Sequence, residues 1–250
     1  MNKKYKWFQF FQEKEDAAYN FFCFPHAGAG ASIYATWGKV VPKSFGFFPV
    51  QYPMRENRRA EPMPSDLKEL AAQLAADHAD LFQSKPCIFF GHCFGALVAY
   101  ETAQVLRNQY HCDVRMLVPA SAISPRKLEG TASLDAMSRE ELVEFFVNLG
   151  YITPEVAQNK MYTDFFIPAL KTDYKLVYQY DPTMDSKLTS WIYAPYGNQD
   201  PNVSPEEIAT WDTVTTGKVV LRAYDGGHFF LNDANLAVLF REVEEMVQDF

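Results

Sequence analysis

The hydrophobic pattern of the chain contains six short apolar runs, separated by longer stretches in which apolar residues recur at helical spacing. The runs cover residues 18–24, 45–52, 87–90, 115–119, 189–194 and 219–224. Several of them are nearly continuous in apolar residues, which is typical of strands that are covered on both faces. We therefore expect six buried strands.

Helical patterns lie between the predicted strands. Ser65 is the expected N-cap of one helix, because it precedes leucines that share one face. These leucines are Leu67, Leu70, Leu74 and Leu81. A second helix is predicted for residues 94–108 and a C-terminal helix for residues 235–250. The apolar stripe of that last helix comprises Leu236, Leu239, Val243 and Met246. Strands that alternate with helices predict an α/β fold, with a mostly parallel central sheet and helices on both faces.

The segment between the fourth and fifth runs departs from this alternation. It contains helical patterns at residues 139–149 and 165–180 but no convincing strand. We expect one domain over residues 1–250, with residues 126–185 inserted in it as a helical lid over an active site. The alternative interpretation is that the segment is only a long crossover connection.

Composition limits the kind of partner and compartment. The chain has 250 residues, 48% of them hydrophobic, and a net charge of −8. No Lys/Arg run is long enough to follow a phosphate backbone, so we expect no nucleic-acid partner. No stretch is long enough to span a membrane, and the N-terminus does not resemble a signal peptide. Four cysteines occur without the C-x-x-C spacing of a zinc or redox site, so we expect a cytoplasmic protein without a bound metal.

The most informative motif is the pentapeptide Gly91-His92-Cys93-Phe94-Gly95, which lies between a predicted strand and a predicted helix. This context is that of a nucleophile elbow in an α/β-hydrolase fold. The turn is so tight that a Cβ atom at Gly91 or Gly95 would collide with neighbouring backbone. The helix N-terminus would stabilise a thiolate on Cys93. The alternative is a structural cysteine between two turn glycines.

A nucleophile of this kind needs a base and an acid that orients it, and in this fold the order along the chain is nucleophile, acid, base. Two histidines follow Cys93. His111 lies in a polar stretch where a surface position is expected, so His228, in a glycine-containing loop after the last predicted strand, is the candidate base. Asp200 is the candidate acid, because it follows the end of the fifth predicted strand. The other acids considered are Asp181, Asp185, Asp212 and Asp225.

An oxyanion hole is expected from two backbone N–H groups. One is that of Phe94, the residue after the nucleophile, and the other comes from the loop after the first predicted strand. Small residues in that loop let the backbone approach a ligand, which makes Ala27 the second candidate. Gly28 and Gly30 can also be explained by the needs of a turn alone.

Several segments together resemble the type II (editing) thioesterases that accompany nonribosomal peptide and polyketide synthases. They are FPHAGAGAS at residues 24–32, Trp37, QYPMRENR at residues 51–58 with Glu61-Pro62, the elbow, the Asp200 turn and GGHFFL at residues 226–231. The resemblance covers nearly the whole chain. Two positions differ from the family pattern: Met54 stands where Gly is usual, and Cys93 stands where the family has Ser.

The resemblance implies an enzyme that removes aberrant or stalled acyl groups from the phosphopantetheine arm of carrier proteins. It implies a helical lid that admits the arm, carrier-protein domains as partners and no cofactor of the enzyme itself. A cysteine nucleophile would form an acyl-enzyme that is itself a thioester, still reactive toward water or an amine. We expect acylation at Cys93, with the acceptor in the release step left open.

The sequence is compatible with other interpretations of Cys93 and of the function. The cysteine is either natural, which we favour, or a Ser→Cys replacement made to trap an acyl-enzyme. The protein could be an acyltransferase that passes the acyl group to an amine or alcohol, or a non-catalytic module that binds carrier proteins. A generic lipase or esterase is a weaker alternative, because residues 24–32 and 51–58 indicate otherwise. We expect a monomer.

Overall fold

The computed structural model describes residues 5–112, 114–126, 134–184 and 186–250. Its centre is a sheet of six parallel strands in the order β2-β1-β3-β4-β5-β6. The strands are β1 (Tyr19–Phe24), β2 (Phe45–Pro49), β3 (Cys87–His92), β4 (Val114–Ala120), β5 (Trp191–Gly197) and β6 (Val219–Tyr224). All six predicted strands are confirmed, with ends that differ by a few residues.

The sheet is buried on both faces by alternate side chains of the same strands. Phe22 and Phe89 lie on one face, with ring centroids 5.4 Å apart. Phe21 lies on the other face, 5.4 Å from Phe240 of the C-terminal helix. These residues belong to two separate apolar clusters, one on each side of the sheet. The nearly continuous apolar runs are explained by this double burial.

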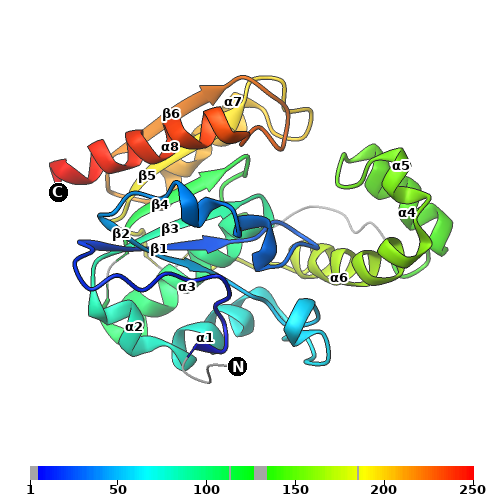
Figure 1. Ribbon diagram of the computed structural model, residues 1–250, viewed down its shortest axis with the longest axis horizontal. Helices are drawn as coiled ribbons and strands as arrows, with labels where there is room; N and C mark the ends of the chain where they lie inside the picture. The colour runs from blue at the N-terminus through cyan, green and yellow to red at the C-terminus, as the bar shows by residue number, and fades with distance from the viewer. Residues whose placement is uncertain (1–4, 113, 127–133, 185) are drawn as a thin grey trace.

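Helices cover both faces, as predicted (Figure 1). One face carries α1 (Leu67–Asp77), α2 (Ala79–Ser84) and α3 (Phe94–Tyr110). The opposite face carries α8 (Asp233–Met246), drawn in red. Leu236, Leu239 and Val243 of its predicted stripe are buried, and Met246 is half-buried. The short helix α7 (Pro205–Ala209) lies between β5 and β6.

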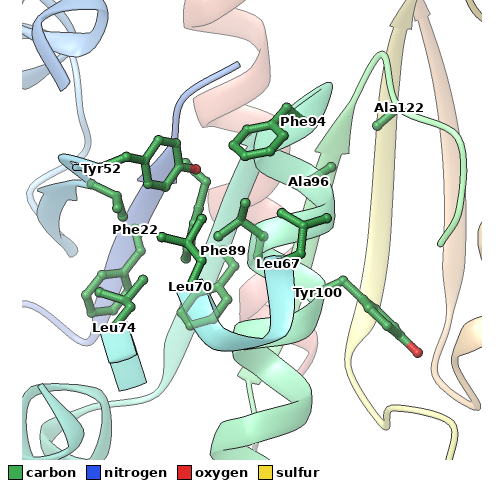
Figure 2. Close-up of a cluster of buried hydrophobic side chains, with 14 of the residues drawn as sticks. Phe22, Tyr52, Leu67, Leu70, Leu74, Phe89, Phe94, Ala96, Tyr100 and Ala122 are labelled. Atoms are coloured by element: carbon green, nitrogen blue, oxygen red, sulfur yellow. The ribbon is translucent and has the colours of Figure 1, made fainter. Parts of the chain in front are cut away.

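The start of α1 differs from the prediction by one residue. The N-cap is Asp66 and not Ser65, because the Asp66 carboxylate accepts a hydrogen bond from the Glu69 N–H at 2.8 Å. Ser65 instead donates from its own N–H and hydroxyl to the Glu69 carboxylate. Three leucines of the predicted apolar face are confirmed, and Figure 2 shows Leu67, Leu70 and Leu74 packed toward Phe22 and Phe89. The fourth, Leu81, belongs to the separate helix α2, because α1 ends at Asp77.

The segment between β4 and β5 is helical, as expected for residues 126–185. It forms α4 (Arg139–Asn148), α5 (Pro154–Ala157) and α6 (Lys160–Tyr178), and its described part, 126 and 134–184, contains no strand. Residues 127–133 and 185 of the predicted insertion lie outside the described residues. Figure 1 shows the three helices on the side to which the strand arrows point. The insertion therefore lies at the carboxyl ends of the parallel strands.

Among the helices described, none combines the length and the apolar character needed to cross a membrane. The longest helix of the insertion, α6, has 19 residues and carries buried and exposed side chains in alternation along its length.

Candidate active site

The turn between β3 and α3 has the backbone strain of a nucleophile elbow. Cys93 has φ +51° and ψ −115°, and it stands between the last residue of β3 and the first of α3. Its N–H donates to the Ala120 carbonyl at 2.9 Å. A Cβ atom on Gly95 would collide with the carbonyl oxygen of Phe24, and one on Gly91 with the backbone of Gly95. Both glycines are therefore required by close backbone approach, as predicted.

The structure brings Asp200 and His228 together from two different loops. Asp200 follows β5 and His228 follows β6, and the Asp200 Oδ2 atom lies 2.9 Å from His228 Nδ1. The other Asp200 oxygen accepts from the Asn202 N–H. Asp225, the acid nearest to His228 in sequence, instead accepts from the Asn198 amide at 2.8 Å. His111 is exposed, at the end of α3. The structure thus places the acid and the base predicted from chain order within hydrogen-bonding distance of each other.

The ionisation of His228 and Asp200 is set by their mutual contact. Burial lowers the pKa of His228, but the Asp200 carboxylate and the Cys93 sulfur outweigh burial and raise this pKa to about 10. Burial likewise raises the pKa of Asp200, and the interaction with His228 outweighs it, so that the net shift is downward. In the described residues His228 Nε2 is buried without a hydrogen-bond partner. This nitrogen is available to carry a proton to or from a bound substrate.

Cys93 is half-buried and its thiol ionises more readily than an ordinary cysteine. Burial alone would raise its pKa, but the nearby His228, the Tyr151 hydroxyl and the Phe94 N–H together lower it. The Sγ atom lies 3.0 Å from Tyr151 Oη. A thiolate beside an imidazolium is the state that these shifts favour, and a thiolate is the nucleophilic form of cysteine.

The two predicted oxyanion donors, the N–H groups of Ala27 and Phe94, belong to residues that line the cavity of Cys93 and His228. The Phe94 N–H faces the sulfur from the first position of α3. The Ala27 N–H has no acceptor in the part of the chain that the structure describes. Both N–H groups thus belong to the wall of the space where an oxyanion would form, and their role as donors stays a prediction.

The segment at residues 51–58 supports the loop that carries Ala27. The Gln51 side chain accepts a hydrogen bond from the Ala31 N–H at 2.9 Å, and Arg55 Nη1 donates to the Ala29 carbonyl at 3.0 Å. Phe94 packs at right angles to Tyr52, with ring centroids 5.7 Å apart, as Figure 2 illustrates. This motif therefore holds the oxyanion loop in place and contributes no nucleophile or base.

Two residues at the site were not singled out by sequence reasoning. His92 is buried, and its Nε2 atom donates to the His228 carbonyl at 2.8 Å, so it holds the loop of the base. It precedes the nucleophile, and chain order alone assigns it no role. Tyr151 comes from the helical insertion and contacts Cys93 through its hydroxyl. A tyrosine in a segment without a motif carries no sequence signal for that contact.

Two cavities adjoin the site. The inner chamber has a volume of about 390 Å³ and contains Cys93 and His228. Its apolar lining includes Leu97, Ile123, Phe145, Leu149 and Val177. The outer groove has a volume of about 780 Å³ and runs between the oxyanion loop and α6. Its lining includes His26, Met54, Arg59, Met161, Phe165 and Phe229. The nucleophile can therefore be reached by a substrate with an apolar part and a second, extended part.

A parallel sheet with a strained elbow after β3, an acid after β5 and a histidine after β6 is the α/β-hydrolase fold. A family model described as the thioesterase domain matches residues 20–247. The chain belongs to this thioesterase family, as the resemblance predicted.

Individual relatives agree with this family. The chain is 33% identical to the thioesterase PikA5 of Streptomyces venezuelae over 227 residues, which cover 91% of this chain and 80% of that protein. It is 35% identical over 211 residues to the phenyloxazoline synthase MbtB of Mycobacterium tuberculosis, covering 84% of this chain but only 15% of MbtB. The chain thus spans a small part of that much longer relative.

A solved structure is similar over nearly the full length. The type II thioesterase BorB from the borrelidin biosynthetic cluster superposes with a TM-score of 0.81 at 29% identity, covering 94% of this chain and 96% of that one. The predicted fold and the predicted family are therefore both confirmed.

Proposed function

We propose that the protein is a thioesterase that hydrolyses acyl groups from the phosphopantetheine arm of carrier proteins, in the editing of nonribosomal peptide or polyketide synthesis. The observation that carries the proposal is the convergence of Cys93 with the Asp200–His228 pair at the wall of an apolar chamber. The similarity to PikA5 and to the type II enzyme BorB supports the choice of a thioester substrate.

The first half of the proposed reaction is acylation of Cys93. The thiolate attacks the thioester carbonyl carbon, and the N–H groups of Ala27 and Phe94 stabilise the oxyanion that forms. The bond from this carbon to the arm sulfur then breaks, and the His228 imidazolium gives its proton to the departing sulfur. The acyl group is now bound to Cys93 in a new thioester, and His228 is neutral.

The second half is hydrolysis of that thioester. Once the sulfur is acylated, its negative charge no longer supports the imidazolium, so the pKa of His228 falls and the neutral ring can act as a base. His228 takes a proton from a water molecule as the water oxygen attacks the acyl carbon. The Cys93–acyl bond breaks, the carboxylic acid leaves, and the thiolate and imidazolium are restored. Asp200 keeps the ring in the tautomer with Nδ1 protonated.

The proposal extends to the setting of the reaction. The steps above use only side chains, backbone N–H groups and water, so they require no cofactor or metal. We place the enzyme in the cytoplasm as a monomer, with carrier-protein domains as partners and neither nucleic acid nor membrane. The position of α4–α6 at the carboxyl ends of the strands supports a role of this insertion as a lid over the site.

The decisive experiment compares acyl-carrier protein and simple acyl thioesters with the wild-type protein and with Cys93→Ala, identifying every product. Release of free acid that depends on Cys93 is the expected result. Intact-mass spectrometry under single-turnover conditions should show one acyl adduct, on Cys93. Cys112→Ala is the matched control, because it removes a half-buried thiol outside the site and should leave both readouts unchanged.

Other outcomes distinguish the remaining functions. An amide or ester as the Cys93-dependent product would make the protein an acyltransferase. Carrier-protein binding without any Cys93-dependent product would make it a binding module, and either result would overturn the proposal.

A further inference from the structure

The inner chamber and the outer groove meet at a single side chain. Among the described residues, Tyr151 alone lines both cavities. Its hydroxyl lies 3.0 Å from Cys93 Sγ, and its ring lies 5.7 Å from Phe229 in the groove and 5.6 Å from Tyr174 in the chamber. The Tyr151 ring therefore forms a partition between the two spaces, directly above the nucleophile.

The hydroxyl of Tyr151 acts as a donor to the sulfur. Burial and the neighbouring Cys93 sulfur raise the pKa of this phenol well above its usual range, so it keeps its proton whenever the thiol is ionised. The resulting hydrogen bond caps the sulfur on the side from which the outer groove opens. Burial alone does not hold the ring, since Tyr151 is only partly buried.

The backbone around Tyr151 suits a side chain that can change position. Tyr151 follows Gly150, which has φ +78° and whose added Cβ would meet no atom within 4 Å. The N–H of Tyr151 donates to the Phe146 carbonyl at 3.0 Å and thereby ends α4. A left-handed glycine after a helix is a junction where the chain changes direction, and here it joins α4 to α5. Tyr151 thus stands at the articulation between two short helices of the insertion.

The Tyr151 hydroxyl occupies a position that a substrate spanning both cavities would need. It lies 3.0 Å from the sulfur, and an attacked carbonyl carbon must approach the sulfur to roughly 3–3.5 Å. The apolar acyl group fits the inner chamber, and the arm that carries it must extend into the outer groove. The thioester between them has to cross the partition.

We propose that Tyr151 is a gate residue, which caps Cys93 when the site is empty and swings aside when an acyl thioester bridges the groove and the chamber. The inference rests on the proposed function, which supplies the acyl thioester substrate, but its test requires no substrate. The gate sets which part of the substrate lies on each side of the nucleophile. It also shields the thiolate from small electrophiles between turnovers.

The test measures the second-order rate of Cys93 alkylation by iodoacetamide in wild type, Tyr151→Ala, Tyr151→Leu and Tyr151→Phe. The pH profile of each variant is followed to its alkaline plateau, where the thiol is fully ionised, so that the plateau rate reports access. A gate that is open in roughly 10% of molecules or fewer predicts an increase of about tenfold or more in Tyr151→Ala. Tyr151→Leu should show a smaller increase, and Tyr151→Phe, which keeps the ring, the smallest.

Tyr110→Phe is the matched control, because this tyrosine ends α3, lines neither cavity and should leave the rate unchanged. Thermal unfolding of each variant identifies any that fails to fold, and Tyr151→Leu preserves most of the apolar packing. Equal alkylation rates in wild type, Tyr151→Ala and Tyr151→Leu would overturn the gate. The alkylation test does not depend on turnover. If Tyr151→Ala is alkylated faster than wild type but wild type hydrolyses no thioester, the gate is supported and the proposed function is rejected.

Discussion

At the scale of single residues, Cys93 and His228 depend on each other for their charge. The pKa of Cys93 is lowered and that of His228 is raised. Burial alone would do the opposite, because it raises the pKa of a thiol and lowers that of an imidazole. Both pKa values shift in the opposite direction, because His228 lowers the pKa of Cys93, while Asp200 and Cys93 raise that of His228. The two pKa shifts together favour the thiolate and the imidazolium over the neutral pair.

The pH dependence of Cys93 alkylation tests this ion pair. The lowered thiol pKa keeps the thiolate populated as the pH falls below about 8.5, where an ordinary cysteine becomes protonated. Asp200→Asn removes the carboxylate that supports the imidazolium, so the pKa of His228 falls and that of Cys93 rises. If the Cys93 pKa rises by one unit, the pH at which alkylation reaches half its maximal rate rises by one unit, while the maximal rate at alkaline pH is unchanged.

The control for that experiment is Asp225→Asn. Asp225 lies in the same loop as His228 but hydrogen-bonds to Asn198, so its replacement should leave the profile unshifted. An unshifted profile in Asp200→Asn as well would mean that the carboxylate does not support the imidazolium.

At the scale of elements, one buried ion pair joins the helical insertion to the oxyanion loop. Arg55 forms two hydrogen bonds with Asp173 of α6, at 2.8 and 2.7 Å, and both side chains are buried. Asp173 also accepts from the Gly28 N–H at 2.7 Å, next to the candidate donor Ala27. This contact fixes the middle of α6 to the loop that must hold an oxyanion.

Breaking this pair should be costly. Asp173→Ala leaves a buried Arg55 charge without a partner, which predicts a loss of about 3–5 kcal/mol in the free energy of unfolding. The double variant Arg55→Met/Asp173→Leu removes both charges and should recover most of that loss. Urea unfolding measures all three proteins.

An exposed ion pair provides the comparison. Arg139 and Asp164 also join two helices of the insertion, but their side chains are 40% and 47% exposed. Asp164→Ala should therefore change the stability by less than about 1 kcal/mol. If Asp173→Ala and Asp164→Ala lost similar free energies of unfolding, burial of the Arg55–Asp173 pair would not increase its contribution to stability.

At the scale of the whole molecule, the outer groove combines segments that are distant in the chain. It is built from the loops after β1, β2 and β6 together with the α4–α5 connection and α6. Three charged side chains line it. Arg55 is bound to Asp173, and Glu56 accepts hydrogen bonds from Ser32. Arg59 is exposed and forms no ion pair within the described residues, so it is the cation available to a ligand in the groove.

This placement predicts that Arg59 contacts the phosphate of the substrate arm. Arg59→Ala should raise the KM for acyl-phosphopantetheine by about two- to fivefold, as expected for an exposed ion pair. The KM for the matching acyl-pantetheine, which lacks the phosphate, should not change. Arg59→Lys keeps the charge and should stay close to wild type. An equal rise in KM for both substrates would instead indicate a general effect on the groove.

Much of the architecture could be predicted because its causes are local. A nearly continuous apolar run such as residues 87–90 is typical of a strand that is covered on both faces of a sheet. The glycines at positions 91 and 95 follow from the steric limits of a single turn. The exact start of α1 could not be predicted, since Ser65 and Asp66 are both good caps. Only the position of the Glu69 N–H decided between them.

The contacts of the insertion could not be predicted for the opposite reason. Tyr151 meets Cys93 across 58 positions, and Asp173 meets Arg55 across 118. No periodicity relates such residues, and each contact exists only because α4–α6 pack at the ends of the strands. His92 was overlooked in the same way, since its bond to His228 spans 136 positions.

The sequence by itself determined the order of the elements, the strained turn at Cys93 and the order of nucleophile, acid and base, because steric limits and chain order act over short distances. The tertiary structure decided how these groups are charged and what covers them. A pKa depends on burial and on charges that approach through space, and a cavity depends on which helices pack together. The lowered pKa of the Cys93 thiol and its contact with Tyr151 are therefore properties of the folded molecule alone.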